Sequence, residues 1–431
     1  MNFTPTFKKT ISNLTWLSFD RVIRLFGAIF VNVFLTRYLG PEKNGILNYS
    51  IAFAGIFAPL AILGMDAVVI RDITRNKSDK NEILGTAFRL RIIGSLISLI
   101  LAFIGIVLMK PNDVQIQLIV LITSIGLIFQ AFDVIDYWFQ SQVLSKFTVY
   151  AKNSAFIILA VCKITAIFLS SALIVFVILS TIEFILAAFF LFLIYRKTGN
   201  YFSEWKFSTQ RAKQLLQNSW PIFISDLAMF AQIRIDQIMI GNFLSNKDVG
   251  LYAAAQRLSE PLGFIPMIIM SSVYPIFLAI KDRSEEEFFS KMTNLYRLMT
   301  IISIITCLSI SLLSNQIVQI LYGEKFIYSG TILAFLIWGR FYTNLGVARS
   351  IFISSENLFR HTLKCSIAGI SVNLILNYFL IQSLGVMGAI YSMFISFFVT
   401  IFLIDAITPE TRRNFKSMLT GITTFYKFKT N

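Results

Sequence analysis

The chain has 431 residues, of which 56% are hydrophobic and only 14% charged, and its formal net charge is +15 at pH 7. A soluble domain carries roughly 25% charged residues, so a surface this apolar is best satisfied in lipid. One histidine and three well-separated cysteines have no spacing typical of a zinc site or a histidine-based triad. We therefore expect no catalytic residues, no metal site and no cofactor.

Apolar segments of spanning length follow one another along the chain, with short polar connections between them. A spanning helix needs about 20 apolar residues. The segments predict an all-α polytopic membrane protein with about twelve transmembrane helices. They cover residues 11–36, 46–66, 92–109, 114–135, 148–169, 171–195, 214–240, 251–280, 298–321, 331–354, 362–381 and 386–406.

The connections alternate in charge, as the positive-inside rule predicts for a protein with both termini in the cytoplasm. Lys and Arg gather at the N-terminus, in every second connection and in the tail; the second connection, for example, holds Arg71, Arg75, Lys77, Lys80, Arg89 and Arg91. The intervening connections hold only Arg37, Lys43, Lys110, Lys247 and Lys325. This basic surface is a topology signal that also suits anionic lipid headgroups, so it indicates no nucleic-acid partner.

A weak internal repeat divides the chain into two halves. Residues 38–46 align with residues 243–251 at an offset of 205, and each block follows the first helix of its half. Because the offset contains six helices, the halves share one orientation, which is a transporter architecture with substrate held between them. We expect two parallel six-helix bundles around a central cavity, at residues 1–200 and 201–406, and a basic cytoplasmic tail at 407–431.

Seven basic residues fall inside predicted helices, where a charge costs roughly 2.5–3.5 kcal/mol even on the lenient insertion scale. They are Arg21, Arg24, Lys163, Arg234, Arg257, Arg340 and Arg349, and their acidic companions are Asp20, Glu183, Asp226, Asp236 and Glu260. Spacing leaves a structural alternative open for some of them. Asp20 can pair with Arg24 and Arg257 with Glu260, while Arg349 lies near a helix end and can extend its charge to the interface. Arg21, Arg234 and Arg340 have no obvious local partner and indicate a cationic cavity. The predicted lining of that cavity is Arg21, Arg24, Arg234, Arg257 and Arg340.

Lys163 and Glu183 lie at similar depths on the two helices of one predicted hairpin. At 1.5 Å per residue their depths differ by roughly 6 Å, which a lysine side chain can span. A structural ion pair and a pair that takes part in ion coupling are both open. The ion-coupling candidates are Lys163, Glu183, Asp20, Asp226 and Asp236.

An ordered set of short motifs resembles the Wzx-type O-antigen and capsule-unit flippases of the multidrug/oligosaccharidyl-lipid/polysaccharide exporter superfamily. The resemblance runs from about residue 11 to 406 and is carried by residues 35–45 (LTRYLGPEKNG), 64–72 (GMDAVVIRD), 136–141 (DYWFQS), 234–241 (RIDQIMIG), 249–255 (VGLYAAA), 320–324 (ILYGE) and 385–389 (GVMGA). Any one of these motifs is weak, whereas their order along the chain is specific.

The resemblance implies alternating access and a polyprenyl-pyrophosphate-linked oligosaccharide as cargo in the bacterial cytoplasmic (inner) membrane. It also implies a coupling ion, H⁺ or Na⁺, and the polymerase and chain-length proteins of the same pathway as candidate partners. The peptidoglycan-precursor flippases of the superfamily usually have fourteen helices, so twelve argue against lipid II as cargo.

Two other function classes compete with this interpretation. A drug exporter of the same superfamily would favour acidic cavity residues for its cationic drugs, whereas basic residues predominate here. A membrane-embedded oligosaccharide polymerase or ligase would need a sizeable exported loop with reactive groups, and the exported connections are short.

Overall fold

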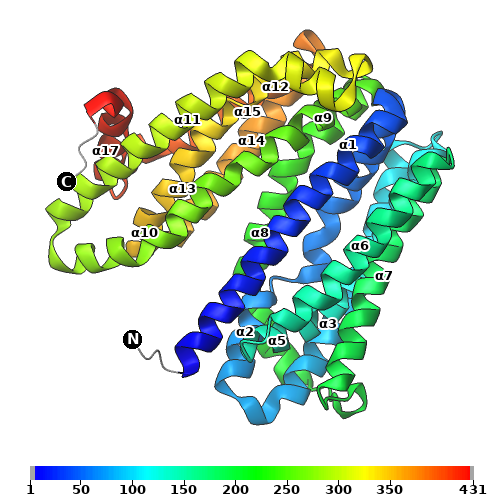
Figure 1. Ribbon diagram of the computed structural model, residues 1–431. Coiled ribbons are helices and arrows are strands. Elements are labelled where there is room, and N and C mark those ends of the chain that lie inside the picture. Colours follow the sequence, from blue (N-terminus) through cyan, green and yellow to red (C-terminus); the bar gives the residue numbers. More distant parts are fainter. Residues whose placement is uncertain (1–4, 428–431) are drawn as a thin grey trace. The chain divides into compact units, whose positions relative to one another are not determined.

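The computed structural model describes residues 5–427 and, within them, the side chains of all but residues 5–15, 17–23, 25 and 359. The described chain is helical apart from its connections (Figure 1). By internal packing it falls into two compact units: Met1–Leu39 with Ile46–Arg234, and Gly40–Gly45 with Ile235–Asn431. The boundary between them therefore lies inside one helix, α8, after Arg234. The predicted boundary at residues 200 and 201 stays a prediction.

The first unit begins with one long helix that bends at Gly40, where φ is 69°. Short 3-10 turns precede α3, α5 and α8. The helices that lie in this unit, the first of them apart from Gly40–Gly45 and the last of them up to Arg234, are α1 (Pro5–Ile62), α2 (Asp66–Arg75), α3 (Lys80–Met109), α4 (Val114–Phe129), α5 (Asp133–Ser141), α6 (Lys146–Phe168), α7 (Leu173–Lys197) and α8 (Thr209–Phe243).

The second unit continues from the end of α8. A π-turn at Val399–Leu403 joins its last two apolar helices. The helices are α9 (Asn246–Ser259), α10 (Phe264–Arg283), α11 (Glu285–Tyr322), α12 (Ile327–Leu336), α13 (Gly339–Ser355), α14 (Phe359–Leu384), α15 (Val386–Phe398), α16 (Ile404–Ile407) and α17 (Arg412–Thr423).

Nine helical stretches of the described chain are long and apolar enough to cross a membrane. Two of the twelve predicted segments share the stretch Phe26–Arg75, because α1 continues through its bend. The predicted segments on α8 and on α12 with α13 are not among the nine, because α8 carries several charges and the other two helices are short. All-helical architecture is therefore confirmed, while the number twelve and the cytoplasmic termini stay predictions.

The sides of α3 show how such helices are built for lipid. Ile93, Ile97 and Ile100 are exposed, whereas Ser95 and Ser98 are fully buried. The hydroxyl of Ser95 donates to the carbonyl of Arg91, and that of Ser98 donates to the carbonyl of Phe57 on α1. Small polar residues inside and large apolar residues outside are what helix packing in a bilayer favours. The exposed apolar surface is thus a lipid-facing surface.

The segment Gly40–Gly45 packs against the start of α9 through residues that the internal repeat predicts to be equivalent. A Cβ on Gly45 would lie 1.6 Å from the carbonyl oxygen of Asn246, and a Cβ on Gly250 would lie 1.9 Å from that of Pro41. Pro41 and Asn246, like Gly45 and Gly250, are separated by the repeat offset of 205. A contact in which each partner meets the equivalent of the other is the mark of a two-fold relation. The contact supports the repeat at this position.

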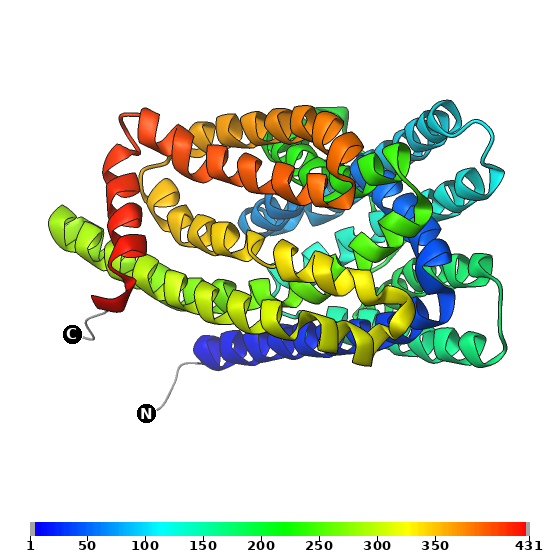
Figure 2. The same cartoon turned by 90° about the horizontal axis from the view of Figure 1, so that it is seen from above.

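The tail folds back onto the second unit as α17, beside α11 (Figure 2). Tyr296 of α11 donates a hydrogen bond of 3.0 Å to Asn414, and both residues are buried. Arg297 reaches Thr424 at 3.0 Å. The basic tail is therefore a docked helix, which hydropathy did not predict.

Candidate functional site

Lys163 and Glu183 form an ion pair of 3.0 Å between α6 and α7. The two helices are the antiparallel neighbours of the predicted hairpin, and Figure 1 shows them side by side. The exposed fractions of the two side chains are 13% and 27%. The structural pair is therefore present, and whether it also takes part in ion coupling stays a prediction.

A cavity of about 250 Å³ lies beside this pair, within the first unit. Its lining contains Arg24 from α1 and Glu183 from α7, which the sequence singled out, with Lys152 from α6. Lys152 is held by Asp133 at 2.7 Å and by Asp136 at 3.1 Å. The remaining lining residues are Phe129, Gln130, Phe184, Ala187, Ala188 and Leu191. The cavity therefore brings the predicted site residues Arg24 and Glu183 together with Lys152 and Asp133, which the sequence did not single out as site residues.

Asp236 is buried near the end of α8, in the second unit. Its carboxylate accepts hydrogen bonds from the hydroxyl of Tyr252 at 3.1 Å and from the amide of Asn377 at 2.7 Å. The same amide donates to Asn373 at 3.0 Å, and the amide oxygen of Asn377 is buried without a hydrogen-bond partner among the described residues. The arrangement is a buried carboxylate held by neutral groups, which sequence spacing could not show.

The arginines predicted to line a cavity divide between the two units. Arg234 is half-buried in the first unit, where a Cβ on Gly55 would lie 3.6 Å from its Nε. Arg257 and Arg340 belong to the second unit and are also half-buried. A Cβ on Gly263 would lie 3.0 Å from Nη1 of Arg340, so its guanidinium packs against the turn between α9 and α10.

For three further candidates, Asp20, Arg21 and Asp226, the structure gives no contact that bears on their predicted roles. Arg21 and Asp20 lie on α1, but their side chains are outside the described residues, so the predicted pairing of Asp20 with Arg24 cannot be placed. Asp226 is half-buried on α8 in the first unit. Their predicted roles stay predictions.

Arg349 does not extend to the membrane interface, contrary to what its position near a helix end predicted. It is buried, and its guanidinium donates two hydrogen bonds of 2.5 Å to the carboxylate of Asp405, which is fully buried. His361 lies 2.8 Å from the same carboxylate, and Cys365 lies 3.5 Å from both His361 and Arg349. Asp405 is not among the acidic residues that the sequence singled out, although a carboxylate inside the predicted span 386–406 was the available signal.

The cluster around Asp405 also contains the ligand types of a metal site. His361, Cys365 and Asp405 each offer one atom within 4.8 Å of the others. However, the guanidinium of Arg349 engages both carboxylate oxygens and places a positive charge where a cation would have to bind. We interpret the cluster as a buried ion-pair network.

Arg91 is a second correction, because hydropathy predicted it to lie in a cytoplasmic connection. It lies within α3, is 1% exposed and donates to the hydroxyl of Tyr137 on α5. The helix starts at Lys80, about twelve residues before the predicted apolar segment. The first turns of α3 are polar, so hydropathy did not indicate that the helix begins there.

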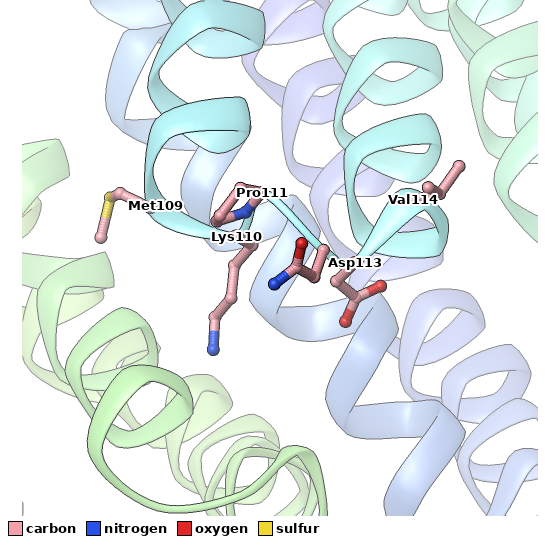
Figure 3. A pocket seen from close by; sticks show the side chains of 6 residues that line it. Met109, Lys110, Pro111, Asp113 and Val114 are labelled. Carbon is pink, nitrogen blue, oxygen red and sulfur yellow. The ribbon is translucent and has the colours of Figure 1, made fainter.

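A larger hollow of about 430 Å³ lies at the turn between α3 and α4 (Figure 3). Six consecutive residues, 109–114, line it. The carboxylate of Asp113 accepts a hydrogen bond of 2.9 Å from the backbone N–H of Ile116 and so begins α4. The polar groups here serve the turn, and we do not regard the hollow as a site.

Comparison with known sequences gives a coherent result. The family described as "Polysaccharide biosynthesis protein" matches residues 11–281. A Shigella flexneri protein named as an O-antigen transporter is 25% identical over 405 residues, which are 89% of this chain and 93% of that protein. A Haloferax volcanii protein named as a low-salt glycan biosynthesis flippase is 23% identical over 202 residues, 45% of this chain and 43% of that one.

Comparison with solved structures places the fold. The lipid II flippase MurJ in an inward closed conformation matches with a TM-score of 0.74 at 14% identity, over 98% of this chain and 94% of that one. An inward-facing multidrug resistance transporter of the MATE family matches with a TM-score of 0.67 at 14% identity, over 96% and 98%. Together the matches confirm the resemblance that the ordered motifs indicated.

Proposed function

Because the chain belongs to the polysaccharide biosynthesis protein family, we propose that it is a flippase for a polyprenyl-pyrophosphate-linked oligosaccharide. It would move the unit from the cytoplasmic to the outer face of the bacterial inner membrane by alternating access. The observation that carries the proposal is the similarity to the O-antigen transporter, which extends over 89% of the chain. The membrane-spanning character and the transporter fold agree with it.

The half-buried arginines support this cargo. A diphosphate needs cations to leave water for a less polar path, and a planar guanidinium can bind phosphate oxygens through two hydrogen bonds. We assign this task to Arg234, Arg257 and Arg340. Arg24 shares its cavity with two carboxylates, so its cation is the least suited of the described four to a diphosphate. Arg21 remains a candidate from the sequence alone.

Ion coupling is the second part of the proposal, and Asp236 is the residue best suited to it. A buried carboxylate held by neutral donors can take up a proton or hold Na⁺ without first breaking an ion pair. Glu183, in contrast, already pairs with Lys163. We propose Asp236, with Asn373, Asn377 and Tyr252 around it, as the coupling group.

The two competing functions predict different phenotypes. Loss of a flippase leaves single lipid-linked units on the inner face of the membrane. Loss of a polymerase leaves units that are exported but not chained, and loss of a drug exporter changes drug susceptibility while surface glycan stays normal.

The test is a deletion of the gene followed by assay of where the lipid-linked unit accumulates. In intact cells of the deletion strain, we expect single lipid-linked units that reagents added outside the cell cannot reach. We expect plasmid-borne protein to restore surface glycan. Expression in strains that lack flippases of known cargo then identifies the unit. Exported but unchained units in the deletion strain would contradict the proposal.

A further inference from the structure

The cavity beside Lys163 and Glu183 has a composition that differs from that of a phosphate site. Its lining contains two cations, Arg24 and Lys152, and two anions, Asp133 and Glu183. These charges balance, so the cavity offers no net attraction to a diphosphate. A cationic drug finds no net attraction there either.

Balanced charges together with apolar surface fit a hydroxyl-rich, uncharged ligand. The carboxylates of Asp133 and Glu183 accept one ion-pair partner each from Lys152 and Lys163, which leaves acceptor capacity for hydroxyl groups. Gln130 adds an amide that both donates and accepts. Phe129 and Phe184 supply ring surface against which the C–H groups of a sugar can pack.

The size of the cavity limits the ligand. Its volume of about 250 Å³ lies just below the range of roughly 300–1,000 Å³ that is typical of sites for drug-sized ligands. It therefore admits one sugar ring and excludes a whole oligosaccharide. Lys152 lies six residues into α6, or about 9 Å from its first residue, which the predicted topology places on the cytoplasmic side. This is the side from which the proposed cargo is loaded.

We propose that this cavity binds one uncharged sugar residue of the oligosaccharide headgroup, separately from the diphosphate. The inference rests on the proposed flippase function and deepens it. The cavity selects the glycan part of the cargo through hydroxyl groups, while cations elsewhere receive the linker.

The test uses full-length protein in lipid nanodiscs and saturation-transfer NMR with methyl glycosides of a hexose, an N-acetylhexosamine and a hexuronic acid. We expect at least one uncharged glycoside to bind, and inorganic pyrophosphate not to displace it. Ala187→Leu fills the cavity without altering its charges, and Gln130→Leu removes the amide. Each should weaken binding about tenfold or more.

Ala279→Leu on the exposed side of α10 is the matched control and should bind like the parent protein. Unchanged binding in both cavity variants, displacement by pyrophosphate, or binding of the hexuronic acid alone would overturn the assignment. So would the absence of binding by every glycoside. The deletion phenotype is scored in cells and is independent of these spectra, so failure of the flippase proposal is recognised separately.

Discussion

At the scale of single residues, the ion pair between Arg349 and Asp405 joins two buried side chains whose charges depend on each other. Arg349→Ala would leave a fully buried carboxylate without its guanidinium, and removing one partner of a buried pair costs about 3–5 kcal/mol. We expect the variant to lose its monodisperse peak in size-exclusion chromatography at clearly lower temperature than the parent protein.

Two further variants decide whether that loss comes from the unpaired charge. Arg71→Ala on α2 removes an exposed partner of Asp72, a pair worth about 0–1 kcal/mol, and should melt like the parent. Replacing both residues, in Arg349→Leu/Asp405→Leu, should recover part of the loss because no unpaired charge remains. A double variant that is less stable than either single one would show that the charge is not the cause.

A charge exchange between Lys163 and Glu183 tests whether this ion pair is structural or takes part in ion coupling. Exchanging the charges, in Lys163→Glu/Glu183→Lys, keeps an ion pair of the same length available between α6 and α7. If the pair is only structural, as its geometry favours, the exchanged protein inserts at the level of the parent protein. Because Glu183 also lines the proposed sugar cavity, lost glycan at normal protein level would show that the pair takes part in transport. Loss of gradient dependence in the remaining transport would then assign the pair to coupling, and retained gradient dependence would assign it to sugar binding.

Asp236 should behave differently from that pair. Asp236→Asn keeps the size of the side chain but removes the group that we propose to exchange the coupling ion. We expect normal protein levels in membranes and loss of the dependence of transport on an imposed H⁺ or Na⁺ gradient. Glu183→Gln is the comparison, and transport by this variant should keep its gradient dependence.

At the scale of elements, Gly45 and Gly250 make the contact that joins the bend of α1 to the start of α9. An alanine methyl at either position would overlap a backbone oxygen at less than 2 Å, so the backbones must separate. We expect Gly45→Ala and Gly250→Ala each to abolish restoration of surface glycan. The same substitution at Gly346 places its methyl 3.4 Å from Ile401, and this variant should function normally. Normal transport in the Gly45→Ala/Gly250→Ala double variant would show that the contact is dispensable.

Hydropathy predicted the apolar helices but not the short polar helices α2 and α17. The apolar runs identified α3, α6, α7 and α11 because each helix must present an apolar surface to lipid. Hydropathy could not identify α17, because this polar helix is held by hydrogen bonds from Tyr296 and Arg297 on α11, which is distant in sequence. The same reason explains the site: Asp236 meets Asn377, and Arg349 meets Asp405, across 141 and 56 positions. Spacing rules for one helix concern neighbours three or four residues apart and do not reach such pairs.

At the scale of the whole molecule, the balance of charge between the connections decides orientation. Basic residues near helix ends resist transfer across the membrane, and they are concentrated in alternate connections. The cytoplasmic loading of the proposed sugar cavity depends on this orientation. The number of crossings between two basic connections must also be even.

Reporter fusions test orientation directly. Fusions after Lys80, Arg211 and Lys291 should report the cytoplasm, since these residues lie in basic connections or at the adjoining helix starts. Fusions after Lys110, between α3 and α4, and after Lys247, at the start of α9, should report the exported side. Lys110 and Lys247 both lie in connections poor in basic residues, so each serves as the internal control for its own unit. Because a single missing crossing between two of these points inverts every later fusion, one clear inversion would exclude twelve spans. An inversion at Lys110 would also place the start of α6, and with it Lys152 of the sugar cavity, on the exported side.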